Sequence, residues 1–128
     1  MTTPDTHVAL VDDDASIRRS VTRMLELSGL RVTAFDSGEN LLRADAAAPF
    51  DCLVLDIHLS GISGPDLYRT LLERGDAPPV VFVTAHEVAE TEAIVGPLGA
   101  VACLRKPFRA AELLAAIAVA ASTHGDRS

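Results

Sequence analysis

The feature that most restricts the fold of this chain is an alternation of short apolar runs with longer segments whose apolar residues recur at helical spacing. Ile17, Val21 and Leu25 share one face of a helix, for example, whereas residues 52–55 are apolar throughout. The apolar runs predict strands over 7–11, 30–35, 52–55, 79–83 and 101–104. The intervening segments predict helices over 15–28, 37–46, 88–98 and 109–121, with a further helix beginning at Pro65.

This regular succession favours one architecture. Five strands alternating with five helices predict an α/β fold of the doubly wound (βα)5 type, in which a five-stranded parallel sheet carries helices on both faces. A strand that is apolar throughout agrees with burial on both faces. The 128 residues fit one domain. We assign residues 1–122 to that domain and residues 123–128 to a polar tail or the start of a linker.

Charge and hydropathy exclude several classes of function. The chain has 18 Asp and Glu against 11 Lys and Arg, a net charge of −7, and no basic stretch, so we expect no direct nucleic acid binding. The longest apolar segment, 110–121, is too short to span a bilayer, and no signal peptide is visible. We therefore expect no membrane association and a cytoplasmic location. Cys52 and Cys103 each lie in an apolar run, where a free cysteine acts as a small hydrophobic residue.

Polar residues stand where four of the predicted strands end. They are Asp12, Asp13 and Asp14 after the first strand, Asp56 after the third, Thr84 after the fourth and Lys106 after the fifth; the apolar Ala85 and Pro107 follow the last two. Because ligands in such folds bind at the carboxyl ends of the strands, we expect these residues to meet at one rim of the sheet. Asp14 is the exception, and we interpret it as the cap of the following helix.

Clustered carboxylates need compensation. Two like charges about 4 Å apart cost on the order of 4 kcal/mol at an effective dielectric of about 20, so such a site must hold a cation or protons. Oxygen ligands with room for water suit Mg²⁺. A carboxylate beside Mg²⁺ can also attack phosphorus and carry the phosphoryl group, whose charge Lys106 would neutralise. Thr84 would donate a hydrogen bond to that group, and the small Ala85 would leave its pocket open.

With these residues in place, the sequence resembles the receiver domain of bacterial two-component response regulators over about 7–121. The motifs that carry the resemblance are Val-Asp-Asp at 11–13, Leu-Asp at 55–56 with Gly64 eight residues after Asp56, Val-Thr-Ala at 83–85, Gly-Ala at 99–100 and Lys-Pro-Phe at 106–108. The resemblance implies a flavodoxin-like strand order, 2-1-3-4-5. It also implies a phosphorelay signalling protein and not an enzyme, with self-phosphorylation and autodephosphorylation as its only reactions.

The resemblance implies how the acidic residues act. Asp56 would be the phosphoacceptor, supplied by a histidine kinase or a phosphotransfer protein. Mg²⁺ would be held by Asp13, Asp56 and the backbone carbonyl of His58, with Asp12 helping through water.

The resemblance also implies how the switch works. Thr84 would be the switch hydroxyl, Lys106 would contact the phosphoryl group, and the Lys106–Pro107 peptide bond would be cis. Many receivers place an aromatic residue where this chain has Cys103, and a cysteine cannot sweep the same volume, so coupling to the outer face would be weaker or differently built.

Two further departures concern residues that follow Asp56 and Thr84. Ser60 stands where relatives carry a proline, which we expect to loosen the loop without removing a ligand. His58 and His86 occupy two positions that tune how fast water removes the phosphoryl group in similar proteins. Two readings stay open: the pair alters that rate, or both are merely exposed rim residues.

The resemblance places the output surface on the fourth helix, fifth strand and fifth helix. The predicted fifth helix is apolar nearly all round, and its surplus apolar surface would face solvent. We expect this face to pair with a second copy of the chain or with an output domain, the alternative being that alanine is simply a good helix former. Both a stand-alone receiver and a piece of a longer regulator fit the sequence.

Two other functions compete with the phosphoacceptor switch. Phosphatases of the haloacid-dehalogenase type also combine Asp, Thr or Ser, Lys and Mg²⁺. They carry Asp-x-Asp-x-Thr/Val after the first strand, and here Asp12 and Asp14 have the spacing whereas Ser16 replaces the last residue. A degenerate receiver that binds a partner without phosphorylation is the other alternative. The complete set of acidic residues, Thr84 and Lys106 argues against it, and Cys103 and Ser60 leave it some room.

Overall fold

The structure, a computed structural model, describes residues 6–44, 50–75 and 77–125, with side chains to residue 122. One parallel sheet contains the strands β1 (His7–Val11), β2 (Arg31–Phe35), β3 (Cys52–Asp56), β4 (Val80–Thr84) and β5 (Ala102–Arg105). Their order across the sheet is β2-β1-β3-β4-β5. The doubly wound fold and the strand order expected from the sequence are therefore confirmed.

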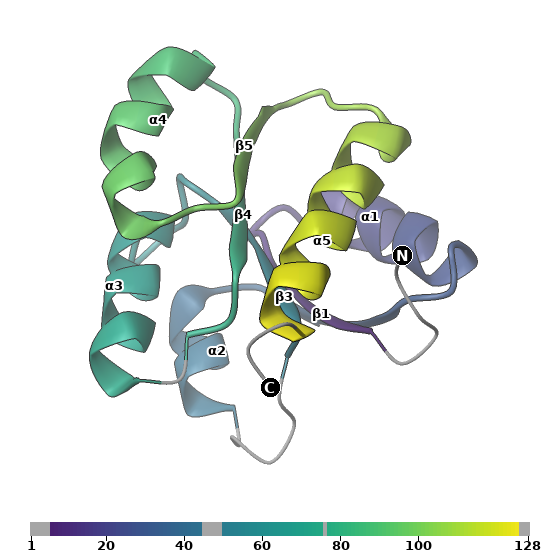
Figure 1. Ribbon diagram of the computed structural model, residues 1–128, viewed down its shortest axis with the longest axis horizontal. Helices are drawn as coiled ribbons and strands as arrows, with labels where there is room; N and C mark the ends of the chain where they lie inside the picture. Colours follow the sequence, from purple (N-terminus) through teal and green to yellow (C-terminus); the bar gives the residue numbers. More distant parts are fainter. Residues whose placement is uncertain (1–5, 45–49, 76, 126–128) are drawn as a thin grey trace.

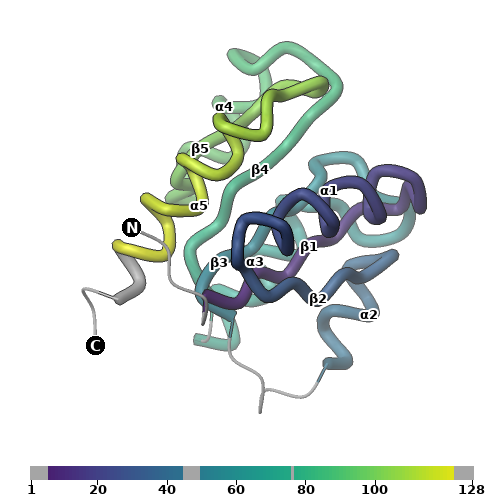
Figure 2. Tube along the Cα trace, turned by 90° about the vertical axis from the view of Figure 1, so that its right-hand side faces the viewer, coloured from purple at the N-terminus to yellow at the C-terminus, as the bar shows by residue number. Residues whose placement is uncertain are grey.

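Helices cover both faces of this sheet (Figure 1). They are α1 (Ala15–Leu27), α2 (Gly38–Arg43), α3 (Gly64–Arg74), α4 (Val88–Val95) and α5 (Ala110–Gly125), with a short 3₁₀ turn, η1 (Gly96–Leu98), after α4. The helices α2, α3 and α4 lie on one side of the sheet, and α1 and α5 lie on the other. Figure 2 shows α1 beside β1, and α5 beside β4 and β5, in agreement with the contacts between these elements.

The core consists of two apolar layers, because successive strand residues point to opposite faces of the sheet. Val8, Leu10, Val54 and Val83 are among the strand residues that pack against α1 and α5. The residues between them face α2, α3 and α4, and they include Ala9, Val11, Leu53, Leu55 and Phe82. Every residue of β1, β3 and β4 is buried, which explains why these strands are apolar almost throughout.

Capping residues fix where several helices begin. The side chain of Asp14 accepts hydrogen bonds from the backbone N–H groups of Ser16 and Ile17, so its interpretation as a cap is confirmed. Ser37 and Ser63 cap α2 and α3 in the same way. The helix predicted over 37–46 is shorter, since α2 ends at Arg43, and residues 45–46 lie outside the described part of the chain.

The C-terminal half departs from the predicted boundaries in two places. The α-helix predicted over 88–98 ends at Val95, and the chain continues as the 3₁₀ turn because Pro97 cannot extend an α-helix. The helix predicted to end at residue 121 continues to Gly125. No Gly or Pro interrupts residues 110–124, which allows this continuation. In the described residues, no helix is both long and apolar enough to cross a membrane.

Candidate functional site

Three carboxylates meet at the carboxyl end of the sheet. Asp12 and Asp13 directly follow β1, and Asp56 ends β3, the strand paired beside it. One oxygen from each carboxylate lies within 4.8 Å of the others. Asp12 is 1% exposed and Asp56 7% exposed, whereas Asp13 lies on the surface. The strand topology thus brings together residues 44 positions apart in the chain, Asp12 and Asp56.

A lysine from β5's end bridges two of these carboxylates. The Nζ atom of Lys106 donates to Asp12 Oδ2 at 2.9 Å and to Asp56 Oδ2 at 2.7 Å. The Lys106–Pro107 peptide bond is cis, and the Lys106 backbone N–H donates to the Thr84 carbonyl. Burial lowers the pKa of Lys106, but its hydrogen bonds and charge interactions with the two aspartates outweigh burial, so the pKa is raised overall. Lys106 therefore stays protonated between them.

The Asp56 carboxyl experiences opposing effects. Burial raises its pKa, and the hydrogen bonds from Lys106 and from the His58 backbone N–H lower it. The charge of Asp12 adds to the increase, and the pKa lies above its ordinary value. A site that disfavours the ionised form in this way gains from a bound cation.

The loop between β3 and α3 contacts the site through Ser60. Its backbone N–H and its Oγ hydroxyl both donate to Asp13 Oδ2, at 3.1 and 3.0 Å. A proline in this position could make neither bond, since it lacks the N–H and the hydroxyl. The structure therefore differs from our expectation of a looser loop: Ser60 ties the loop to Asp13.

Gly64 begins α3 in close contact with the end of β3. Its N–H donates to the Ile57 carbonyl, and a Cβ atom built on it would lie 2.2 Å from the Asp56 carbonyl oxygen. No side chain fits there, which explains why glycine stands eight residues after Asp56.

Thr84 and the two rim histidines lie beside the carboxylates. Thr84 is fully buried, and its Oγ1 accepts a hydrogen bond from the His86 backbone N–H at 3.0 Å. Among the described residues, no hydrogen bond joins Thr84 to the carboxylates. Ala85 is exposed, and the rings of His58 and His86 pack against each other with centroids 4.4 Å apart. The two histidines are therefore exposed yet in mutual contact.

Cys103 lies away from the carboxylates. It pairs with Phe82 in the register of β4 and β5 and packs against the apolar layer beneath α3 and α4. Burial, followed by the charge of Glu92, raises the pKa of its thiol. Both cysteines are free thiols, and burial raises the pKa of Cys52 to about 12. Neither thiol is activated as a nucleophile.

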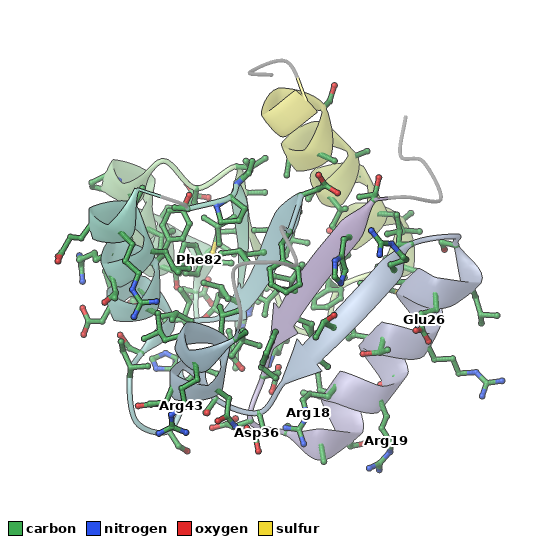
Figure 3. All side chains as sticks on the ribbon, turned by 90° about the horizontal axis from the view of Figure 1, so that it is seen from below. Arg18, Arg19, Glu26, Asp36, Arg43 and Phe82 are labelled. Atoms are coloured by element: carbon green, nitrogen blue, oxygen red, sulfur yellow. The ribbon has the colours of Figure 1, made fainter. Side chains whose placement is uncertain are left out.

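Arg18 is a residue near the site that sequence reasoning missed. Its Nη1 donates to the Asp12 carbonyl at 2.7 Å. Figure 3 shows Arg18 on α1 lying close to Asp36, and both line a polar hollow with Asn40 and Arg43. In the sequence, Arg18 lies outside the apolar face of α1, so helical periodicity gave no signal of this contact. The contact depends on how α1 packs beside the end of β1.

Together, the fold and the site define a class of protein: a doubly wound α/β domain whose strand ends bring together three carboxylates, two of them bridged by a lysine. A family model narrows this class, because the model described as the response regulator receiver domain matches residues 8–118. The chain belongs to the response regulator receiver domain family, whose members are signalling proteins of two-component systems. Membership gives no support to the phosphatase alternative.

Several curated relatives are similar over most of this chain. The transcriptional regulatory protein TdiR of Thauera aromatica is 38% identical over 110 residues, covering 86% of this chain and 48% of that protein. Nodulation protein W of Bradyrhizobium diazoefficiens is 40% identical over 120 residues, covering 94% of this chain and 52% of its own length. The chain thus spans about half the length of these relatives.

Solved structures agree with the fold. The response regulator StyR superposes with a TM-score of 0.86 at 33% identity, covering 96% of this chain and 62% of that one. A receiver domain protein from Clostridium thermocellum gives a TM-score of 0.88 at 24% identity over 96% of this chain and 99% of that one, which supports the fold alone.

Proposed function

We propose that this domain is a Mg²⁺-dependent phosphoacceptor switch in which Asp56 receives a phosphoryl group from a histidine kinase or a phosphotransfer protein. The observation that carries the proposal is the position of Asp56, at the end of β3 with Lys106 Nζ at 2.7 Å and two further carboxylates beside it. Family membership supports the same chemistry. The phosphorylation-independent alternative receives no support from a site in which every expected polar residue is present.

The donor set fits Mg²⁺. The three clustered side chains all offer carboxylate oxygens, the kind of ligand that a hard cation requires. Three ionised carboxylates and one ammonium leave two negative charges uncompensated, which a divalent cation would balance. Asp13, Asp56 and the His58 carbonyl would hold the ion, with Asp12 acting through water. When bound, it would neutralise charge on the transferred phosphoryl group.

The reaction needs few further groups. An Asp56 carboxylate oxygen forms the new O–P bond while the N–P bond of a phosphohistidine in the donor protein breaks, and the released imidazole nitrogen takes up a proton. Lys106 then pairs with a phosphoryl oxygen in place of an aspartate. The Thr84 hydroxyl turns to donate to a second oxygen, and Ala85 leaves space for it.

Response and partners complete the proposal. The outer face of α4, β5 and α5 would transmit the switch to a second copy or an output domain, and the exposed Ile94 and Val119 give it apolar contact area. With Cys103 at this position, coupling of Thr84 to this face would be weaker or differently built. His58 and His86 would either tune loss of the phosphoryl group to water or be merely exposed rim residues. Phosphorylation and signalling would take place in the cytoplasm. The names of relatives such as the transcriptional regulatory protein TdiR point to transcription as the process that is regulated.

The direct test is intact mass after incubation with acetyl phosphate and Mg²⁺. We expect one added phosphoryl group in the wild type and none in Asp56→Asn. The control is Asp14→Asn, which alters a neighbouring aspartate that caps α1 and should still be phosphorylated. Addition to Asp56→Asn, or none to the wild type, would contradict the proposal.

A further inference from the structure

The loop that leads from Asp56 to α3 is held by carboxylates at every second residue. The backbone N–H of His58 donates to Asp56 Oδ1 at 3.0 Å, that of Ser60 to Asp13 Oδ2 at 3.1 Å, and that of Ile62 to Glu39 Oε2 at 2.8 Å. The first two acceptors belong to the acidic site. The third, Glu39, lies on α2, and nothing in the function proposed above uses it.

The approach of Glu39 to this loop depends on a glycine. Gly61 has φ +79, a conformation that side chains disfavour, and a Cβ atom on it would lie 2.5 Å from Glu39 Oε2. The bond from Ile62 is the main reason that the pKa of the Glu39 carboxyl lies below its ordinary value. An ionised carboxylate thus holds the far end of the loop through a charge-assisted hydrogen bond.

The position of Glu39 in its helix would by itself favour an acidic residue. The residue lies in the first turn of α2, where any acidic side chain interacts favourably with the helix dipole. Its side chain nevertheless reaches across to another element, 23 residues along the chain, and meets a backbone N–H there. Length, and not charge alone, is what that contact requires.

We infer that Glu39 is a positioning residue for the Mg²⁺ site, acting through the loop of residues 57–63. By fixing Ile62, Glu39 holds Ser60 where both of its donors bond one oxygen of Asp13, so that the orientation of this carboxylate is set by the loop. The same constraint fixes the backbone beside His58, whose carbonyl is a proposed ligand. This inference rests on the proposed function, since it assumes that the acidic site binds Mg²⁺.

Calorimetric titration of Mg²⁺ into the unphosphorylated protein tests the inference without any measurement of activity. We expect Glu39→Ala to bind Mg²⁺ about tenfold more weakly, as is typical when a group that orients a metal ligand is lost. Glu39→Gln retains an oxygen acceptor of the same length and should bind nearly as the wild type does. Glu39→Asp retains the charge but is one methylene shorter, so it should resemble Glu39→Ala. The matched control is Glu26→Ala, which removes an exposed acidic side chain on α1 (Figure 3).

A second measurement follows the contact itself. Amide hydrogen exchange at Ile62 should be faster in Glu39→Ala and Glu39→Asp and unchanged in Glu39→Gln, because only the glutamine keeps the acceptor in reach. This pair of conservative variants also decides the matter if Glu39→Ala fails to fold.

The Mg²⁺ titrations distinguish failure of the Glu39 inference from failure of the proposed phosphoacceptor function. Equal Mg²⁺ affinity in the wild type and Glu39→Asp would overturn the inference alone, as would equal losses in Glu39→Gln and Glu39→Asp. A wild type that binds no Mg²⁺ would overturn both the inference and the proposed function.

Discussion

Gly64→Ala should be among the most damaging single-methyl additions in this protein. The added Cβ atom would lie 2.2 Å from the Asp56 carbonyl oxygen, 3.1 Å from the Asp56 carbonyl carbon and 3.2 Å from the Ile57 Cα atom. All three are backbone atoms, so no flexible side chain can move aside. Relief requires α3 and the end of β3 to separate by roughly 1 Å in a close-packed interior.

The expected magnitude follows from that geometry. Overpacking typically costs about 1–3 kcal/mol of unfolding free energy. Because two backbone segments must move, we expect Gly64→Ala to cost about 3 kcal/mol. For a domain of this size, such a loss lowers the Tm by roughly 10 °C. Because Asp56 itself must shift, phosphorylation from acetyl phosphate should slow as well.

The assay is urea unfolding followed by far-ultraviolet circular dichroism, since the chain has no tryptophan. The matched control is Gly96→Ala, at a residue with φ −54 and with no atom within 4 Å of the added Cβ. Gly96→Ala should be neutral or stabilising by about 0.5 kcal/mol. If Gly64→Ala lost no more stability than Gly96→Ala, the argument from the contact with Asp56 would be refuted.

Four further predictions concern the site and its supports. In metal-free buffer at neutral pH, Asp56→Asn should unfold at a higher urea concentration than the wild type. A carboxyl whose pKa is raised above 3.8 in the folded state contributes stability below pH 3.8 and loses that contribution as the pH rises through the folded-state pKa. The extra stability of Asp56→Asn over the wild type should therefore shrink as the pH falls toward 3.8. Addition of Mg²⁺ should stabilise the wild type by about 2.7 kcal/mol at a hundredfold excess over Kd, chelation should remove the effect, and Asp13→Asn should show little of it in the same thermal melts. Asp14→Ala should lose about 1 kcal/mol of unfolding free energy through its lost cap, with Mg²⁺ affinity unchanged by calorimetry; a large loss of affinity would mean that Asp14 is more than a cap. Thr22→Val should raise the unfolding free energy by about 1 kcal/mol, because the Thr22 hydroxyl is buried without a hydrogen-bond partner in the described structure; a fall in the urea midpoint would contradict this.

The sequence predicted the fold and the acidic centre of the site for physical reasons that are local or topological. Burial of β1, β3 and β4 on both faces demands apolar residues at nearly every position, and that pattern is visible in the sequence. Once the strands are parallel, their carboxyl ends must lie together, so the meeting of Asp12, Asp56 and Lys106 follows from topology. The roles assigned to these residues stay predictions that the phosphorylation experiment tests.

The contacts that support the site were beyond sequence reasoning. The bonds from Ser60 to Asp13 and from Ile62 to Glu39 depend on the path of a loop, which neither helical nor strand periodicity describes. A comparison with proline at position 60 even suggested the opposite effect, because it counted lost rigidity and not gained hydrogen bonds. Helix ends were also imprecise, as α5 shows by continuing to Gly125.

The bridge from Lys106 to Asp12 and Asp56 has a consequence for how folding and ion binding are related. Lys106 supplies a counter-ion to the two buried acids from within the protein, so the domain can fold before a divalent ion binds, and the ion would then add to the stability of the folded state. A cell could therefore accumulate the folded protein at low free magnesium, where the missing ion would chiefly limit the chemistry that comes afterwards.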